Sequence, residues 1–202
     1  MLPSFDKFST AYIDAQTLLN LLKNYKNPRD CISRMVKKKI LIRLKNGFYL
    51  ISEKNKYKTI PYEQIANLLY GPSYVSLEWA LSYYQMIPER VVNITNVTTG
   101  KSKEFETEIG LFSYYHLPLA CYDHGVEKKK SDEWPGGFFI ASKEKAILDL
   151  IYLKYKDFTT LEDFLESTRI DIKSIKELDI QLLNQLARKY KNEAINKFIG
   201  SL

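Results

Sequence analysis

The hydrophobic and polar positions of the first sixty residues follow a helical period and then change to a strand period. Leucines repeat at helical spacing within DAQTLLNLLKNY, where Asp14 occupies the N-cap position of a predicted helix. The period then shortens to two residues in ILIRL and FYLIS, which are predicted strands. Asn46 and Gly47 lie between these strands, and this dipeptide favours a type I′ turn, so the segment predicts a β-hairpin.

A second helix is predicted between these elements, from Asn27 to about residue 39. Asparagine at the N-cap followed by Pro28 at the first helical position is a favoured helix start, because proline there needs no hydrogen-bond donor. Ile32, Met35 and Val36 then fall at positions i, i+3 and i+4, which places them on one apolar stripe. The opposite face of the helix must therefore point to solvent.

That outward face and the hairpin beside it are rich in basic side chains. A helix of about ten residues is roughly 15 Å long and 10–12 Å wide with its side chains, which matches the width of a B-DNA major groove. The order of helix, capped basic helix and hairpin is that of a winged helix-turn-helix, whose second helix enters the groove. The predicted DNA-contacting residues are Arg29, Ser33, Arg34, Lys37 and Lys38 of the helix and Arg43 and Lys45 of the hairpin.

The distribution of charge agrees with a partner that is a polyanion. Residues 1–60 hold thirteen Lys and Arg against four Asp and Glu, whereas residues 61–202 hold seventeen against twenty. Lysines that neutralise phosphates release counterions, which gives strong but salt-sensitive binding, and Arg29 and Arg34 are suited to bidentate contacts with guanine. A solvated lysine-rich face without any partner is the alternative explanation of the charge alone.

The remaining sequence predicts a larger α+β region after a polar linker at 53–61. Two helices are expected in PYEQIANLLYG and SLEWALSYYQMIP, followed by strands in VVNITNV and GGFFIA. Between those strands KEFETEIGLFSYYHL alternates strictly, with its glutamates on one face, which predicts a half-buried antiparallel hairpin. From Ser142 onward the pattern is helical, and Thr160 with Asp163 resembles a capping box.

The expected fold class is therefore α+β, in two domains. Residues 1–57 are predicted to form a winged helix-turn-helix. Residues 62–202 are predicted to form a mixed α+β domain with a small antiparallel sheet and a C-terminal helical pack. Within this domain Trp79 is expected to anchor the core, Trp134 to lie in a loop where it marks a contact, and Lys128–Lys130 to form a solvated loop.

Three segments together resemble one protein family. SRMVKKKILIRLKNGFYLI, PSYVSLEWALSYYQMIPERV and FFIASKEKAILDLIYL, in this order and spacing, are similar to the AbiEi antitoxins, the regulators of type IV (AbiE-type) toxin–antitoxin and abortive infection systems. The resemblance spans most of residues 10–155. It implies a transcriptional repressor that binds inverted repeats of double-stranded DNA at its own promoter, with the seven basic and polar residues above as the DNA contacts.

The resemblance also implies a functional partner and contains one departure. The C-terminal domain would counter a nucleotidyltransferase-type toxin, and a stable complex between the two is not required in this family. A glycine often precedes the first wing strand, whereas Lys39 stands there in this chain. Because a left-handed conformation is less comfortable for lysine than for glycine, the helix is expected to run on or to turn differently at this point.

Catalytic, metal and cofactor chemistry is not expected. His116 and His124 are spaced for no helical metal motif, Cys31 and Cys121 are isolated, and no phosphate-binding or nucleophile motif occurs. Asp149, which lies beside an apolar stripe, is predicted to be a buried hydrogen-bonded carboxylate that holds the domain together. The isolated cysteines and the absence of a signal-peptide pattern favour a reduced, cytoplasmic protein.

One rival function remains open, as does the oligomeric state. The winged scaffold can instead serve as a protein-interaction module whose positive face meets an acidic protein, without sequence-specific DNA binding. Binding to inverted repeats would involve two protomers, either as a preformed dimer or as monomers that cooperate on DNA.

Overall fold

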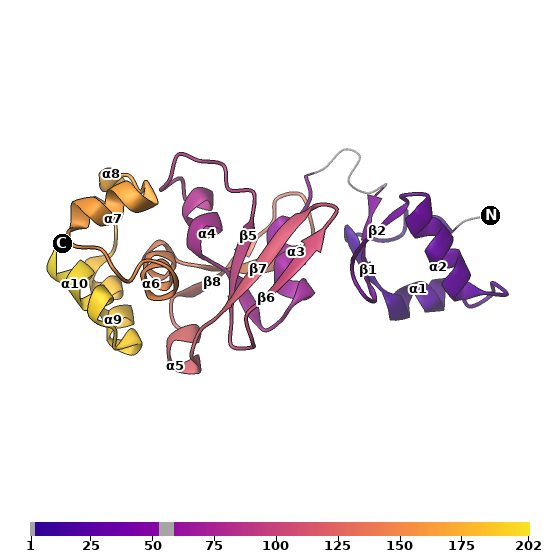
Figure 1. Ribbon diagram of the computed structural model, residues 1–202. Coiled ribbons are helices and arrows are strands. Elements are labelled where there is room, and N and C mark those ends of the chain that lie inside the picture. The colour runs from indigo at the N-terminus through magenta and orange to yellow at the C-terminus, as the bar shows by residue number, and fades with distance from the viewer. Residues whose placement is uncertain (1–2, 53–58) are drawn as a thin grey trace.

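A three-stranded antiparallel sheet organises the N-terminal unit, residues 3–52, at one end of the molecule (Figure 1). The structure is a computed structural model that describes residues 3–52 and 59–202. The sheet has the order β1–β3–β2, so that β3 is central and β2 is an edge. Its strands are β1 Tyr12–Asp14, β2 Leu41–Lys45 and β3 Phe48–Ile51. Of the predicted linker at 53–61, residues 53–58 lie outside the described residues.

Two helices cover one face of this sheet, and both were predicted. They are α1 Ala15–Leu21 and α2 Pro28–Lys37. The carboxylate of Asp14 caps α1 by accepting from the Thr17 amide at 2.8 Å, which lowers the pKa of Asp14. Asn27 occupies the N-cap of α2 without a side-chain hydrogen bond, so Pro28 supplies the start signal there.

The C-terminal end of α2 differs from the expectation for Lys39. The helix neither runs on nor avoids the left-handed region, because Lys39 adopts φ +56°. Its amide donates to the Val36 carbonyl and the Ile40 amide donates to the Met35 carbonyl, both at 3.0 Å. These two bonds form a Schellman motif, the usual helix stop that places glycine at this position. Lysine therefore occupies a glycine-type site.

The hairpin turn is also not the predicted type I′. The structure joins β2 to β3 through Asn46 and Gly47, and Gly47 has φ +79°. Asn46 is not among the described non-glycine residues with positive φ, whereas a type I′ turn requires positive φ at both central residues. The strand register shifts between Arg43 and Lys45, which indicates a β-bulge next to the turn.

The three-stranded sheet is covered on both faces. On one face Leu41, Tyr49 and Ile51 join the small core formed with the two helices. On the other face Leu44 and Leu50 belong to the large hydrophobic core of the second unit, residues 59–202. The two units are therefore in continuous apolar contact through the sheet, and α2 lies on the side away from the second unit (Figure 1).

A six-stranded mixed sheet forms the middle of the molecule and is larger than the small antiparallel sheet predicted. The pairs β5–β7 and β4–β9 are parallel, and the other pairs are antiparallel. In spatial order the strands are β6 Lys103–Thr107, β7 Gly110–His116, β5 Ile94–Thr98, β4 Ser73–Val75, β9 Gly137–Ala141 and β8 Val126–Lys130. Four of these were expected, whereas β4 and β8 were not.

One residue assignment in this unit was wrong. Lys128–Lys130 do not form a loop but lie in β8, where Lys129 and Phe138 are partners across the β8–β9 ladder. Trp134 does lie in the loop between β8 and β9, as predicted. It is buried at 4% exposure, and its indole N–H donates to the Thr59 carbonyl at 2.7 Å. Contacts distant in sequence determine the pairing of β8 and the partner of Trp134, so local pattern does not reveal them.

Helices surround this sheet and extend beyond it to the other end of the molecule (Figure 1). α3 packs on β4 and β9, α4 packs on β5 and α6, and α9 and α10 pack on α6. The predicted capping box is present at the start of α7. The helices are α3 Tyr62–Leu69, α4 Leu77–Tyr83, α5 Leu119–Tyr122, α6 Lys143–Leu153, α7 Leu161–Thr168, α8 Ile172–Lys176, α9 Ile180–Tyr190 and α10 Glu193–Gly200.

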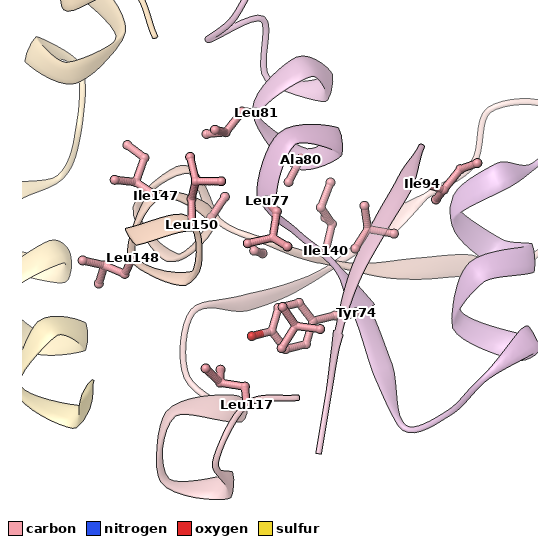
Figure 2. Packing of buried hydrophobic residues seen from close by; sticks show 14 of the residues in the cluster. Tyr74, Leu77, Ala80, Leu81, Ile94, Leu117, Ile140, Ile147, Leu148 and Leu150 are labelled. Atoms are coloured by element: carbon pink, nitrogen blue, oxygen red, sulfur yellow. The ribbon is translucent and has the colours of Figure 1, made fainter. Parts of the chain in front are cut away.

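The centre of the large core lies where β4, α4, β9 and α6 meet. Figure 2 shows Tyr74 of β4 and Leu77 at the start of α4 beside Ile140 of β9, with Ile147 and Leu150 of α6 nearby. All five side chains are at most 1% exposed. Burial of a leucine or isoleucine of this kind contributes about 1.5–3 kcal/mol, so this junction fixes the second unit.

Asp149 of α6 is fully buried in this core, and the prediction of a hydrogen-bonded structural carboxylate is confirmed. One carboxylate oxygen accepts from Tyr74 at 2.9 Å and from Ser76 at 2.7 Å. The other accepts from Lys145 at 2.7 Å and from Tyr190 at 2.5 Å. Lys145 is also fully buried, and this ion pair at i and i+4 was not predicted. Ser76 thus uses its hydroxyl for Asp149 rather than to cap α4.

Candidate nucleic-acid interface

The outward face of α2 presents the five predicted side chains of this helix together. Arg29, Ser33 and Lys37 follow one another at intervals of four residues, and Arg34 and Lys38 lie one position further round. All five are exposed, whereas Cys31, Ile32 and Met35 of the same helix are buried. The apolar stripe therefore orients the helix so that its basic side faces solvent.

Among the described residues, no ion pair neutralises the charges on this face. Within residues 3–52 and 59–202, no carboxylate lies within 4.0 Å of the charged nitrogens of Arg29, Arg34, Lys37 or Lys38. The Ser33 hydroxyl donates to the Arg29 carbonyl at 3.1 Å, which keeps this short side chain close to the helix. Within the described part of the chain, the four cations of this face are thus unpaired.

Arg43 lies on the edge strand β2 and is exposed. Its cross-strand partner is Tyr49, and its guanidinium carbon lies 6.0 Å from the centroid of the Tyr49 ring. Because side chains alternate along a strand, Arg43 shares the face of Leu41, which is the face covered by the helices. The structure therefore places Arg43 on the same side of the sheet as α2.

Lys45 is placed differently from the other six predicted residues. Its ammonium group donates to the Leu69 carbonyl at 2.5 Å and to the Leu68 carbonyl at 3.5 Å, at the C-terminal end of α3. Cations are favoured at this end of a helix because the last carbonyls lack partners. Partial burial lowers the pKa of Lys45, and the nearby charge of Lys103 lowers it further. Lys45 thus connects the two units.

Lys39 provides a second polar connection between the units. Its ammonium forms an ion pair with Glu108, which lies in the turn between β6 and β7. Both side chains are about half exposed or more, so the pair itself contributes little to stability. Lys39 was noticeable in the sequence, because the AbiEi family often has glycine at this position. Nothing in the sequence indicated that Glu108 would be its partner.

The other candidate groups do not form a second chemical site. Asp123 and His124 are both exposed and share a hydrogen bond of 2.5 Å, which lowers the pKa of the Asp123 carboxyl. Cys121 is buried, which raises the pKa of its thiol, and the thiol donates to the Lys189 carbonyl. The described residues contain no cluster of three or more His, Cys, Asp or Glu placed to hold a metal ion.

No helix in the described part of the chain is both long enough and apolar enough to cross a membrane. No protein-family model matches this chain, and no curated protein matches it.

The chemistry that the basic face of α2 can perform is therefore inferred from its geometry alone. A rigid basic helix about 15 Å long with free guanidinium and ammonium groups can enter a groove of duplex DNA and contact both phosphates and base edges.

Proposed function

We propose that this chain is a DNA-binding transcriptional repressor and antitoxin of a type IV, AbiE-type toxin–antitoxin system. In this proposal the N-terminal unit is a winged helix-turn-helix with α1 and α2 as the helix pair and β2 and β3 as the wing. It binds inverted repeats in its own promoter. The resemblance of the three sequence segments described above supports the family assignment.

The observation that carries the proposal is the free basic face of α2. α2 lies on the side of the N-terminal sheet away from the second unit, whose residues are net acidic, and no described carboxylate pairs with its cations. Unpaired positive charges on one helix repel one another, so they do not stabilise the folded protein. Their concentration on α2 is better explained by a polyanionic partner. Duplex DNA supplies the missing negative charge at a matching width.

The proposal assigns different tasks to the residues of this face. Arg29 and Arg34 carry planar donor groups that fit the two acceptors of guanine in the major groove. Lys37 and Lys38 bind phosphates, which fixes the position of the helix but reads no sequence. Arg43 binds a phosphate or a minor-groove edge beside the wing. Lys45 contributes little to binding, because its ammonium is used at the junction of the units.

The test is a gel-shift titration with duplex DNA from the region upstream of the gene. The double variant Arg34→Glu, Lys37→Glu is expected to lose at least 100-fold in affinity, because two attractive contacts become repulsive. The matched control is Lys173→Glu, Lys176→Glu, which reverses two exposed lysines on α8 of the second unit and is expected to bind normally. Circular dichroism verifies that both variants fold.

The same titration separates the repressor from the rival interaction module. For DNA binding the logarithm of the association constant falls linearly with the logarithm of salt concentration. Lys37→Met is expected to reduce this slope by about 0.9, the share of one phosphate. Equal affinity for the upstream duplex and for a shuffled duplex would favour a module without sequence-specific DNA binding. Unchanged binding by the double variant would exclude α2 as the reading helix.

The antitoxin part of the proposal needs its own experiment. The partner is expected to be a nucleotidyltransferase-type toxin encoded next to this gene. Co-expression of this chain with that toxin should restore growth, and the Arg34→Glu, Lys37→Glu variant should still do so, because the second unit carries this activity in the proposal. Failure of the wild-type chain to restore growth would remove the antitoxin assignment and leave the repressor assignment intact.

A further inference from the structure

A cavity of about 500 Å³ lies between the two units and plays no part in the function proposed above. Tyr12 of β1 reaches it from the N-terminal unit. From the second unit it is lined by residues of α3, β4, α5, β8 and β9. Small-molecule sites in proteins are most often cavities of roughly 300–1,000 Å³, and they occur preferentially between domains. Its size and its position are therefore those of a ligand site.

The walls of the cavity are aromatic and apolar. Tyr12, Tyr74, Tyr122 and Phe139 line it, and the rings of Tyr74 and Tyr122 lie 5.0 Å apart. Two of its apolar lining residues are unusually exposed for their type, because Leu68 and Phe139 are both 48% exposed. Large apolar side chains on a protein surface commonly mark a place where something binds. Flat aromatic molecules pack well against such walls.

Two residues that line the cavity each contain a buried oxygen without a hydrogen-bond partner in the described part of the chain. Gln64 and Ser73 line it and are 3% and 6% exposed, and the Gln64 Oε1 and Ser73 Oγ atoms make no hydrogen bond among the described residues. A buried polar atom without a partner costs about 1–3 kcal/mol, so such atoms are rare and need an explanation. Both oxygens can accept a hydrogen bond. They are covered as the side chains stand, and a ligand that donates to them after a rotation of these side chains toward the cavity would remove this cost.

The charge at the cavity restricts the ligand further. Asp123 is the one charged side chain among the described residues that line it. Its side chain is 65% exposed and pairs with His124, and no lysine or arginine lines the cavity to attract an anion. An acidic ligand would meet repulsion at the entrance and find no counter-charge inside. The geometry therefore excludes carboxylates and phosphates as occupants.

From these features we infer that the cavity binds a small aromatic molecule without negative charge that donates an N–H or O–H hydrogen bond to Gln64 Oε1 or Ser73 Oγ. The aromatic walls hold its ring, and the two acceptors fix its orientation. Because Tyr12 belongs to the N-terminal unit, the bound molecule contacts both units at once. The inference does not depend on DNA binding, and it can be tested on the protein alone.

The test uses indole and 1-methylindole as probes, followed by NMR of the methyl groups of the full-length protein. The two molecules differ by one methyl group that replaces the N–H donor. Indole is expected to shift the methyl signals of Leu68 and Val126, which line the cavity, in a saturable way, and to leave that of the exposed Val92 unchanged. 1-Methylindole is expected to bind at least tenfold more weakly, because it leaves the buried acceptors unpaired. Indole-3-acetate should be weakened likewise by its charge.

Two variants localise the effect. Leu68→Trp places a large side chain at the mouth of the cavity and is expected to abolish indole binding, whereas Val92→Trp, at a site 78% exposed and outside the cavity, should not change it. Ser73→Ala removes one acceptor and should reduce the preference for indole over 1-methylindole at least threefold. Equal affinity of the wild-type protein for both probes, or full binding by Leu68→Trp, would overturn the inference.

Discussion

The two units of this protein use charged side chains in opposite ways. In the N-terminal unit the cations of α2 are exposed and unpaired within the described chain. In the second unit the Lys145–Asp149 pair is fully buried, and each partner makes several hydrogen bonds. An exposed unpaired cation adds little to stability and is free to bind a ligand, whereas a buried pair is tied to the fold.

This contrast shows why charge alone does not indicate function. Asp149 lies among tyrosines and a lysine, which is an arrangement that also occurs in active sites. Asp149 and Lys145 are both closed to solvent, however, and each carboxylate oxygen already accepts two hydrogen bonds. The basic face of α2 has the reverse properties. Substitutions at the buried pair of the second unit should therefore change stability, whereas substitutions on the basic face of α2 should change binding.

The largest effect is expected from Asp149→Ala. Removal of one member of a buried ion pair leaves the other charge without a partner, which costs about 3–5 kcal/mol of unfolding free energy. Urea unfolding followed by circular dichroism measures this loss. The double replacement Lys145→Met, Asp149→Leu removes both charges and should recover the part of the loss that comes from the unpaired Lys145 ammonium. The hydroxyls of Tyr74, Ser76 and Tyr190 still lack their acceptor in this variant, so the recovery is partial. A loss below about 1 kcal/mol for Asp149→Ala would show that the buried pair is not tied to the fold.

Alkaline pH should lower the free energy of unfolding of the second unit through the two tyrosines that donate to Asp149. Burial raises the pKa of Tyr74 and of Tyr190 well above the usual 10, and the neighbouring Asp149 carboxylate adds to both shifts. Above about pH 10 the unfolded chain therefore loses these protons while the folded chain keeps them, so stability is complete below pH 10 and falls above it. Each such group lowers the free energy of unfolding by up to about 1.4 kcal/mol per pH unit.

Urea unfolding between pH 8 and pH 11 tests this dependence. Tyr190→Phe is expected to lower stability at pH 8, because its hydroxyl donates to Asp149, and to reduce the alkaline slope by the share of one group. Tyr25→Phe, at a partly buried position of the N-terminal unit outside this cluster, serves as the control. An alkaline slope that Tyr190→Phe leaves unchanged would show that other groups cause it.

The elements that were predicted correctly are those with strong local signals. α2 follows from Asn27-Pro28 and its apolar stripe, and the β6–β7 hairpin follows from strict alternation. The capping box of α7 is a signal within four residues, and each partner bonds the other's amide at 3.1 Å. In each case neighbours in sequence are also the contacting residues.

The features that were missed depend on contacts far apart in the chain. β4 has three residues and pairs in parallel with β9, more than sixty residues away, so no local period marks it. The sequence of the β2–β3 hairpin shows the basic character of Lys45, but its position depends on the end of α3. The i and i+4 spacing of Lys145 and Asp149 was visible, yet only the assembled core shows that both are buried.

A smaller effect should distinguish two lysines of the N-terminal unit. Lys45→Met removes the bond from its ammonium to the end of α3 and is expected to cost about 1 kcal/mol of unfolding free energy, with little change in DNA affinity. Lys38→Met should leave stability within about 0.5 kcal/mol of wild type and weaken DNA binding. Urea unfolding and the gel-shift titration measure the two properties. The opposite result would exchange the roles assigned to these residues.

The smallest effect tests the helix stop at Lys39, where we expect Lys39→Gly to stabilise the protein by about 0.5–1 kcal/mol. Glycine adopts a φ of +56° without the steric cost that lysine pays there, and this gain exceeds the exposed Lys39–Glu108 pair that is lost. Lys38→Gly makes the same chemical change one residue earlier, at φ −83°, and should destabilise by a similar amount. Glu108→Gln measures the ion pair alone. Thermal unfolding that shows the same sign for both glycine variants would mean that the left-handed backbone at Lys39 carries no strain.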